Sequence, residues 1–172
     1  TQGDEHKGTG TQGDVPFVSP GDTKGTSPCA PTSPCALVYS PDKILELIGE
    51  LDSRSYTFKK TGGVHSAALG SQQGILMRYE DIGRHNAVDK VIGNAFLQKV
   101  PLNDKCLVLS GRVSSEIVQK VYRNNIPIII SRSAPTLLAI RMASEAGMTI
   151  IGFARGNRFN IYSHSQRLKT EP

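Results

Sequence analysis

Five arginines lie in four polar stretches of the sequence, and each stretch follows a short apolar run. A guanidinium group can bind phosphate or carboxylate through two parallel hydrogen bonds, and it can also stack on a nucleotide base. Arginine repeated after apolar runs therefore favours the binding of an anion, and of phosphate in particular. The five residues are Arg84, Arg112, Arg132, Arg155 and Arg158.

The densest polar cluster runs from Glu80 to Asn86 and contains Arg84 and His85. It separates an apolar run from a segment with helical apolar spacing, so we expect it at a helix N-terminus, where free backbone N–H groups attract anions. Capping of this helix by Asp81, with ion pairs along the helix, is the structural alternative. Capping leaves the adjacent histidine and asparagine unexplained, so we prefer a ligand-facing role.

His65 stands among small residues and is a candidate acid, base or metal ligand. A packed or hydrogen-bonded histidine is the commoner explanation of such a residue. Zinc deaminases need His-x-Glu followed by Pro-Cys-x-x-Cys. Here Ala67 stands two residues after His65, and neither Cys29 nor Cys35 is followed by a cysteine three residues later. We therefore predict no metal site.

The three cysteines are too few and too unevenly spaced for a disulfide scaffold, which favours a reducing compartment. Cys106 lies inside an apolar run and is best explained as a small buried hydrophobe. Cys29 and Cys35 lie on a segment that we expect to be mobile, where a thiol could move between a donor and an acceptor. Unselected cysteines in a low-complexity tail are the alternative.

The stretch 152–158 contains two arginines around Gly156 and Asn157. An ordinary Gly-Asn turn between two strands would explain the glycine and the asparagine. Glycine would also let backbone N–H groups approach a diphosphate, with the arginines binding its oxygens. The three other arginine-bearing loops expected at the same edge favour the binding role.

Short strands alternate with helices from residue 75 to residue 153. This order predicts a three-layer α/β/α domain with a mostly parallel sheet, made mixed by a hairpin of the first two strands. Loops beyond the carboxyl ends of such strands converge on one crevice, which the arginines would make strongly positive. Ser40 and Pro41 predict a helix start, Pro135 resembles a first-turn helix proline, and Phe96 is placed on the buried stripe of its helix.

The totals fit one domain with a tail: 172 residues with a formal net charge of +5. Residues 1–40 are rich in Gly, Thr, Ser and Pro and predict a disordered tail, 41–165 form the domain, and 166–172 are expected to fray.

A solvated basic surface would also explain the net positive charge. Few aromatic residues accompany the basic ones, which disfavours nucleic-acid binding. We find neither a membrane-length apolar run nor a signal peptide, so we expect a soluble, cytoplasmic protein without membrane partners.

Five ordered motifs between about Phe58 and Tyr162 resemble the signatures of the FdhD family, the formate dehydrogenase accessory sulfurtransferases. The resemblance covers the carboxyl-terminal domain of that family. The motifs are Thr61–His65, Glu80–Lys90, Ser110–Ser114, Ser133–Thr136 and Gly152–Asn160.

This resemblance implies a cytidine-deaminase-like fold, without zinc and usually dimeric. It also implies that the protein takes persulfide sulfur from a cysteine desulfurase. The sulfur would pass to the molybdenum (or tungsten) bis-molybdopterin guanine dinucleotide cofactor, bound as a substrate, before the cofactor enters the formate dehydrogenase apoenzyme. The two guanosine diphosphate groups of that cofactor agree with the arginine-lined crevice expected above.

The family's cofactor-binding stretch matches Phe153, Ala154, Arg155, Gly156, Asn157 and Arg158. The loop residues proposed to join them are Arg84, His85, Asn86, Arg112 and Arg132, and the catalytic candidates are Cys35, Cys29 and His65. The sequence departs from the family in two respects: its amino-terminal β-rich region is not recognisable, and Cys29 and Cys35 replace a Cys-x-x-Cys loop. A non-catalytic cofactor-binding chaperone module is therefore the alternative function.

Overall fold

The computed structural model describes residues 37–169, so the expected tail and its two cysteines, Cys29 and Cys35, lie outside the described residues. Six strands form one sheet in the order β2-β1-β3-β4-β5-β6. The strands are β1 (His65–Ser71), β2 (Gly74–Asp81), β3 (Cys106–Leu109), β4 (Ile128–Ser131), β5 (Thr149–Arg155) and β6 (Arg158–Ser163). The helices are α1 (Pro41–Ser53), α2 (Tyr56–Thr61), α3 (Arg84–Leu97), α4 (Ser115–Arg123), α5 (Leu137–Glu145) and the 3-10 helix η1 (Ser165–Arg167).

Strand directions confirm the predicted mixed sheet. Strands β3, β4 and β5 are parallel, β1 is antiparallel to both β2 and β3, and β6 is antiparallel to β5. The carboxyl ends of β2, β3, β4 and β5 therefore meet at one edge, together with the starts of β1 and β6. We call this edge the rim; it comprises loops 82–83, 110–114, 132–136 and 156–157 and the first residue of β1.

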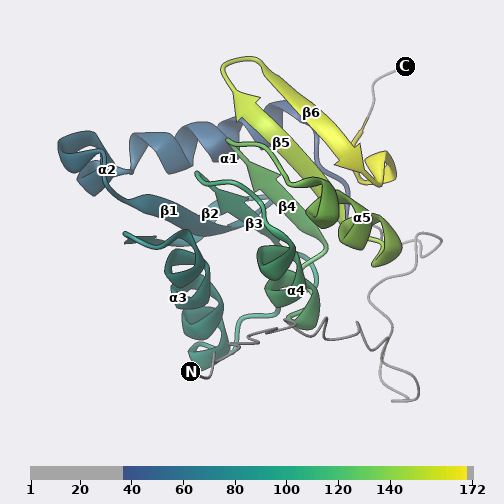
Figure 1. Ribbon diagram of the computed structural model, residues 1–172, viewed down its shortest axis with the longest axis horizontal. Coiled ribbons are helices and arrows are strands. Elements are labelled where there is room, and N and C mark those ends of the chain that lie inside the picture. Colours follow the sequence, from purple (N-terminus) through teal and green to yellow (C-terminus); the bar gives the residue numbers. More distant parts are fainter. Residues whose placement is uncertain (1–36, 170–172) are drawn as a thin grey trace, which may run out of the picture.

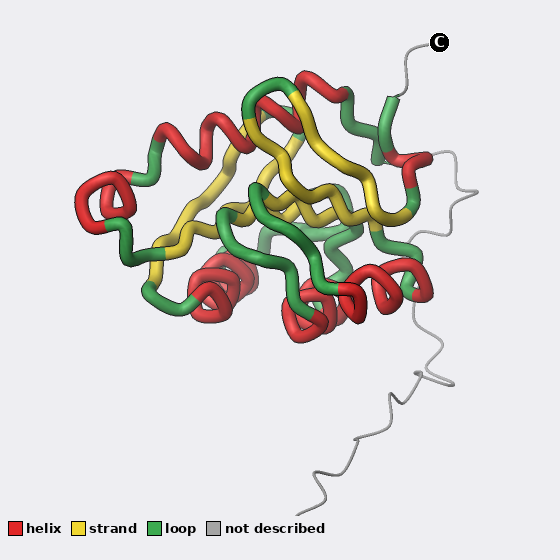
Figure 2. Tube along the Cα trace, turned by 45° about the horizontal axis from the view of Figure 1, so that its top comes forward, coloured by secondary structure: helices red, strands yellow, loops and turns green. Residues whose placement is uncertain are grey.

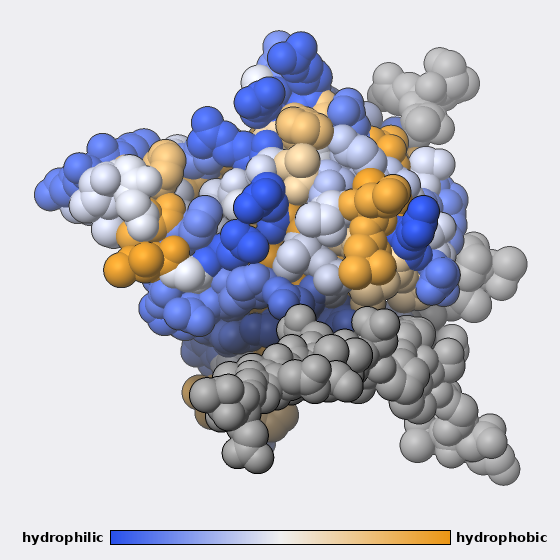
Figure 3. Space-filling model, in the orientation of Figure 1, coloured by the Kyte–Doolittle hydropathy of each residue, from blue (hydrophilic) through white to orange (hydrophobic). Residues whose placement is uncertain are grey.

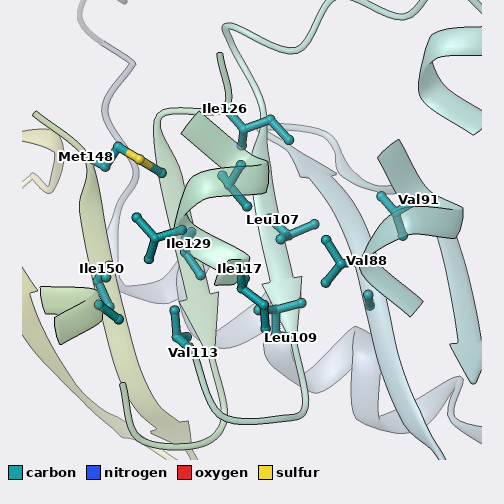
Figure 4. Packing of buried hydrophobic residues seen from close by; sticks show 14 of the residues in the cluster. Val88, Val91, Leu107, Leu109, Val113, Ile117, Ile126, Ile129, Met148 and Ile150 are labelled. Atoms are coloured by element: carbon teal, nitrogen blue, oxygen red, sulfur yellow. The ribbon is translucent and has the colours of Figure 1, made fainter. Parts of the chain in front are cut away.

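The sheet is covered on both faces, as the three-layer prediction requires. Helix α1 lies on one face, and α3, α4 and α5 lie on the other (Figures 1 and 2). The larger core lies under α3–α5, where Leu107, Ile129 and Ile150 of neighbouring strands pack against helix residues such as Val88 and Ile117 (Figure 4). Strands buried on both faces explain the continuous apolar runs in the sequence.

Helix α1 begins as predicted. Pro41 occupies its first turn, and the side chain of the N-cap residue Ser40 accepts a hydrogen bond of 3.2 Å from the backbone N–H of Lys43. The packed part of the chain extends beyond the expected bounds of 41 and 165 at both ends. Tyr39 is 1 % exposed and forms a parallel bridge with Leu168, which is 6 % exposed.

Three local features differ from the sequence-based expectations. Pro135 is not in a helix: it forms a bridge with Val113, and α5 begins at Leu137, with Thr136 as the cap. Phe96 is 78 % exposed, because the buried stripe of α3 ends at Ala95. Helix α2 was not expected; it buries none of its residues and is ended by a glycine in the left-handed conformation.

Candidate functional site

The loop between β2 and α3 is held by Asp81. Its carboxylate accepts hydrogen bonds from the backbone N–H of Gly83 (2.9 Å) and the side-chain amide of Asn86 (3.1 Å), and it forms an ion pair with Lys90 at 2.6 Å. The Lys90 hydrogen bond, followed by those from Gly83 and Asn86, lowers the pKa of Asp81 to about 2. Asp81 is not the helix cap, because Gly83 occupies that position without a side-chain cap.

Arg84, His65 and Gly111 come together at the middle of the rim. A side-chain carbon on Gly111 would lie 3.2 Å from Nδ1 of His65 and 3.4 Å from Cβ of Arg84. Glycine therefore lets the β3–α4 loop approach both side chains closely. Nε of Arg84 is buried and has no hydrogen-bond partner in the structure, although the residue as a whole is only partly buried. An unsatisfied guanidinium N–H of this kind is available to an anion.

Hydrogen bonds join the neighbouring loops of the rim. The backbone N–H of Ser66 donates to Oγ of Ser110 at 2.9 Å, and Oγ of Ser131 donates to the carbonyl of Gly111 at 2.8 Å. Further along, Val113 and Pro135 form a bridge between the loops after β3 and β4. The rim is therefore a connected structure, which can hold a ligand without large rearrangement.

The β5–β6 hairpin forms the far end of the rim. Gly152 packs tightly here, since an added side-chain carbon would lie 2.9 Å from Cδ of Pro135. The ladder between β5 and β6 is irregular from Gly152 to Arg155, and Phe153 has a left-handed φ of 52°. Bulky residues rarely adopt that conformation, and such outliers cluster at functional sites. Phe153 is 37 % exposed, and the Arg155 guanidinium lies 5.9 Å from the centre of its ring.

The tip of this hairpin is basic and exposed. Gly156 and Asn157 form the turn, so the structural alternative for this stretch is confirmed. An open hollow of about 480 Å³ is lined by four residues of the tip. In Figure 3 the tip projects at the top as a hydrophilic cap. The lining residues are Arg155, Gly156, Asn157 and Arg158.

The five arginines share the rim but differ in their freedom to bind a ligand. Arg112, Arg155 and Arg158 are exposed, whereas Arg84 is partly buried. The Arg132 side chain forms an ion pair of 3.1 Å with Asp52 on α1. That ion pair is partly exposed and therefore weak, but it directs Arg132 toward the opposite face of the sheet from α3.

Two other predicted site residues have partners inside the protein. Nε2 of His85 lies 3.2 Å from the carboxylate of Glu116 on α4, and the amide of Asn86 donates to Asp81. Sequence reasoning missed Glu116 and Asp52, because neither stands in a loop with an arginine. It also gave no role to Ser114, whose buried Oγ has no hydrogen-bond partner in the structure.

The described residues offer neither a metal cluster nor a reactive thiol. Within residues 37–169, no three His, Cys, Asp or Glu side chains lie close enough together to hold a metal ion. Cys106 is fully buried, as expected, and burial raises the pKa of its thiol to about 12. In the same part of the chain, no helix has the length and apolar character needed to cross a membrane.

The fold and the rim define a mixed α/β domain with an edge that carries arginines and ends in an arginine-rich hairpin. The sequence matches the FdhD/NarQ family over residues 9–169, and the chain belongs to this family. The match begins at residue 9, so it includes most of residues 1–40, the segment whose composition differs from that of the rest of the chain.

The relatives agree with this assignment. The chain is 47 % identical over 129 residues to the sulfur carrier protein FdhD of Bacillus pumilus, covering 75 % of this chain and 49 % of that protein. It is 49 % identical over 136 residues to the FdhD of Sulfurisphaera tokodaii, covering 78 % and 53 %. The chain thus spans about half the length of these relatives.

A solved structure also resembles the domain. It is described as a formate dehydrogenase accessory protein from Desulfotalea psychrophila, with 32 % identity and a TM-score of 0.73, and the match covers 77 % of this chain and 57 % of that one.

Proposed function

We propose that this chain acts as a sulfur carrier, which takes persulfide sulfur from a cysteine desulfurase and passes it to the molybdenum (or tungsten) bis-molybdopterin guanine dinucleotide cofactor for formate dehydrogenase. The cofactor is the substrate. Membership of the family, and the names of the relatives as sulfur carriers and a formate dehydrogenase accessory protein, support this proposal. We also propose a cytoplasmic homodimer.

The observation that carries the nucleotide half of the proposal is the β5–β6 tip. Two exposed arginines flank a glycine turn there, beside a strained and partly exposed Phe153. Arg155 and Arg158 can each bind diphosphate oxygens through charge-assisted hydrogen bonds, while the Phe153 ring offers a stacking surface. We assign the guanosine diphosphate end of the cofactor to this tip.

The middle of the rim is suited to a second anionic group. Nε of Arg84 has no hydrogen-bond partner, and the N-cap residue of α3, Gly83, provides no side-chain cap. Both features leave N–H groups available to an anion. In this proposal His65 beside Gly111 orients a polar group of the cofactor or moves a proton, and Arg112 adds positive charge.

The sulfur half of the proposal requires an accessible thiol. Loading is an exchange in which a cysteine thiolate attacks the outer sulfur of the donor's persulfide, a new S–S bond forms, and the donor leaves as a thiolate. Cys106 is unsuited to this step, because it is buried and its pKa is raised to about 12. Cys29 and Cys35 are the remaining cysteines of the chain.

Chain length distinguishes these two thiols. Tyr39 is fixed beside Leu168, and α1 extends from there for 13 residues, roughly 20 Å, before Asp52 meets Arg132 at the rim. Cys35 is two residues from Leu37, a reach of about 7 Å, and Cys29 is eight residues away, a reach of about 28 Å. Within one chain, only Cys29 can reach the rim while Tyr39 stays in place.

Calorimetry with guanosine diphosphate tests the nucleotide half. Arg158→Ala should weaken binding by the loss of one or two charge-assisted hydrogen bonds, about 1.5 to 3 kcal/mol each. Arg123→Ala, an exposed arginine at the end of α4, is the matched control and should bind as the wild type does. Undetectable binding by the wild type, or equal binding by both variants, would remove the nucleotide from the proposal.

The alternative is a cofactor-binding chaperone module without sulfur exchange. It is favoured by the absence of an accessible thiol among residues 37–169, where Cys106 is the one cysteine. A persulfide assay after incubation with a cysteine desulfurase and its substrate separates the two functions. Labelled sulfur retained on Cys29 or Cys35 supports the carrier, and an unlabelled chain that still binds guanosine diphosphate supports the chaperone.

A further inference from the structure

The outer edge of β2 has backbone groups free to pair with another strand. Strand β2 is the last strand of the sheet on its side. Ser66 of β1 directs its backbone toward β3, because its N–H donates to Oγ of Ser110 and its carbonyl accepts from the N–H of Ser110. Glu80 is the residue opposite Ser66 on β2, so its N–H and C=O point away from β1. Arg78, two residues earlier, faces the same way.

The side chains along this edge are complementary to themselves. If two copies of β2 lie antiparallel with Tyr79 opposite Tyr79, then Arg78 of each copy faces Glu80 of the other. Opposite charges directly across two strands stabilise a sheet, and a twofold axis supplies this pair twice.

We propose that β2 is the dimer interface, and that it pairs antiparallel with β2 of a second copy about a twofold axis at Tyr79. Arg78 and Glu80 then form narrow pairs, each of which exchanges two backbone hydrogen bonds with the other copy. The result is one continuous sheet through both copies. Proteins usually protect a long unpaired edge strand, because it can pair with other chains. The alternating charges of Arg78 and Glu80 favour a second copy of this chain as the partner of β2.

The contacts already present at this edge are compatible with the pairing. Nζ of Lys90 donates to the Glu80 carbonyl at 3.2 Å, but it also binds Asp81 at 2.6 Å and can keep that ion pair when it leaves Glu80. Nη1 of Arg78 lies 3.1 Å from Oε1 of its own Glu80. It lacks hydrogen-bond geometry there, so a carboxylate from the second copy would give this buried donor a partner.

Charge reversal tests the interface independently of sulfur or cofactor. We expect the wild-type chain to be a dimer by light scattering during gel filtration, and Arg78→Glu or Glu80→Arg alone to raise its dissociation constant about tenfold or more. Arg78→Glu places four acidic residues across the axis, and Glu80→Arg places four basic ones. An equal mixture of the two variants should therefore recover the dimer as a heterodimer. Arg123→Glu is the matched control and should remain a homodimer.

A second readout locates the interface. In the dimer, the amides of Arg78 and Glu80 should exchange hydrogen at least tenfold more slowly than in the monomeric variants, whose circular dichroism verifies folding. A monomeric wild type, single variants that stay dimeric, a mixture of folded variants that fails to associate, or fast exchange at these amides in the dimer would each overturn the proposal.

Discussion

At the scale of single residues, Phe153 has a strained backbone and lies in the proposed nucleotide-binding site. Its left-handed φ of 52° costs about 1 to 3 kcal/mol for a residue with a side chain. The guanidinium of Arg155 lies near the Phe153 ring, and the β5–β6 ladder is irregular around it. Both observations are consistent with a Phe153 side chain that is positioned to contact a ligand.

Replacing this residue should separate strain from binding. Phe153→Gly and Phe153→Ala both remove the ring, but only glycine relieves the left-handed backbone. We expect the glycine variant to be more stable than the alanine variant by about 1 kcal/mol, as measured by urea unfolding. Both variants should bind guanosine diphosphate more weakly than the wild type. A glycine variant less stable than the alanine variant would show that Phe153 is not strained in solution.

The carboxylate of Asp81 makes the β2–α3 loop sensitive to acid. Its pKa is lowered to about 2 in the folded chain, against about 3.9 for a free aspartate. A lowered pKa stabilises the fold above the unfolded value, and this contribution disappears as the pH falls through the folded value. The stabilisation should therefore be complete above about pH 5, mostly lost by about pH 2 and absent near pH 1.

Asp81→Asn checks this expectation. The wild type should have the higher melting temperature at about pH 5, and most of the difference should be lost at about pH 2. Lys90→Met should raise the pKa of Asp81, since the Lys90 hydrogen bond is the largest cause of its shift. A melting-temperature difference that is the same at both pH values would contradict the assigned role.

At the scale of elements, the features that could be predicted from the sequence are those that hydrophobic periodicity determines. The alternation of strands and helices, the hairpin of β1 and β2, and the start of α1 at Pro41 follow from local pattern and capping. The convergence of the arginine loops follows from parallel strands. These features depend on residues close together in the chain.

Features that depend on distant partners could not be predicted. The position of Pro135 is decided by its bridge to Val113, and the direction of Arg132 by Asp52, which lies 80 residues earlier. Phe96 had helical spacing, but the core under α3 ends before it. The close approach of Gly111 to His65 likewise needs two strands to pair first.

At the scale of the whole molecule, Tyr39 fixes the start of the packed chain. It is buried in the cluster under α1, and its backbone exchanges hydrogen bonds with the segment at Leu168. Burial, and then the neighbouring Cys106, raise the pKa of its hydroxyl. Tyr39 therefore determines both where the domain begins and where the upstream cysteines are attached.

Two truncations test this assignment. Removal of residues 1–36 should leave the free energy of unfolding nearly unchanged, because that composition offers little to a core. Removal of residues 1–39 also deletes the Tyr39 side chain and should cost about 3 to 5 kcal/mol. Urea unfolding of both products measures the difference. Equal stability of the two would show that Tyr39 contributes nothing to the core.

The central claim is that one part of the molecule carries sulfur and another holds the acceptor. Radiolabelled sulfur, followed from a cysteine desulfurase to the chain and on to the cofactor, tests it most directly. The variant with both Arg155→Ala and Arg158→Ala should load sulfur as the wild type does but fail to deliver it. The variant with both Cys29→Ala and Cys35→Ala should bind guanosine diphosphate normally and deliver none. Sulfur delivery by this cysteine variant would contradict the account.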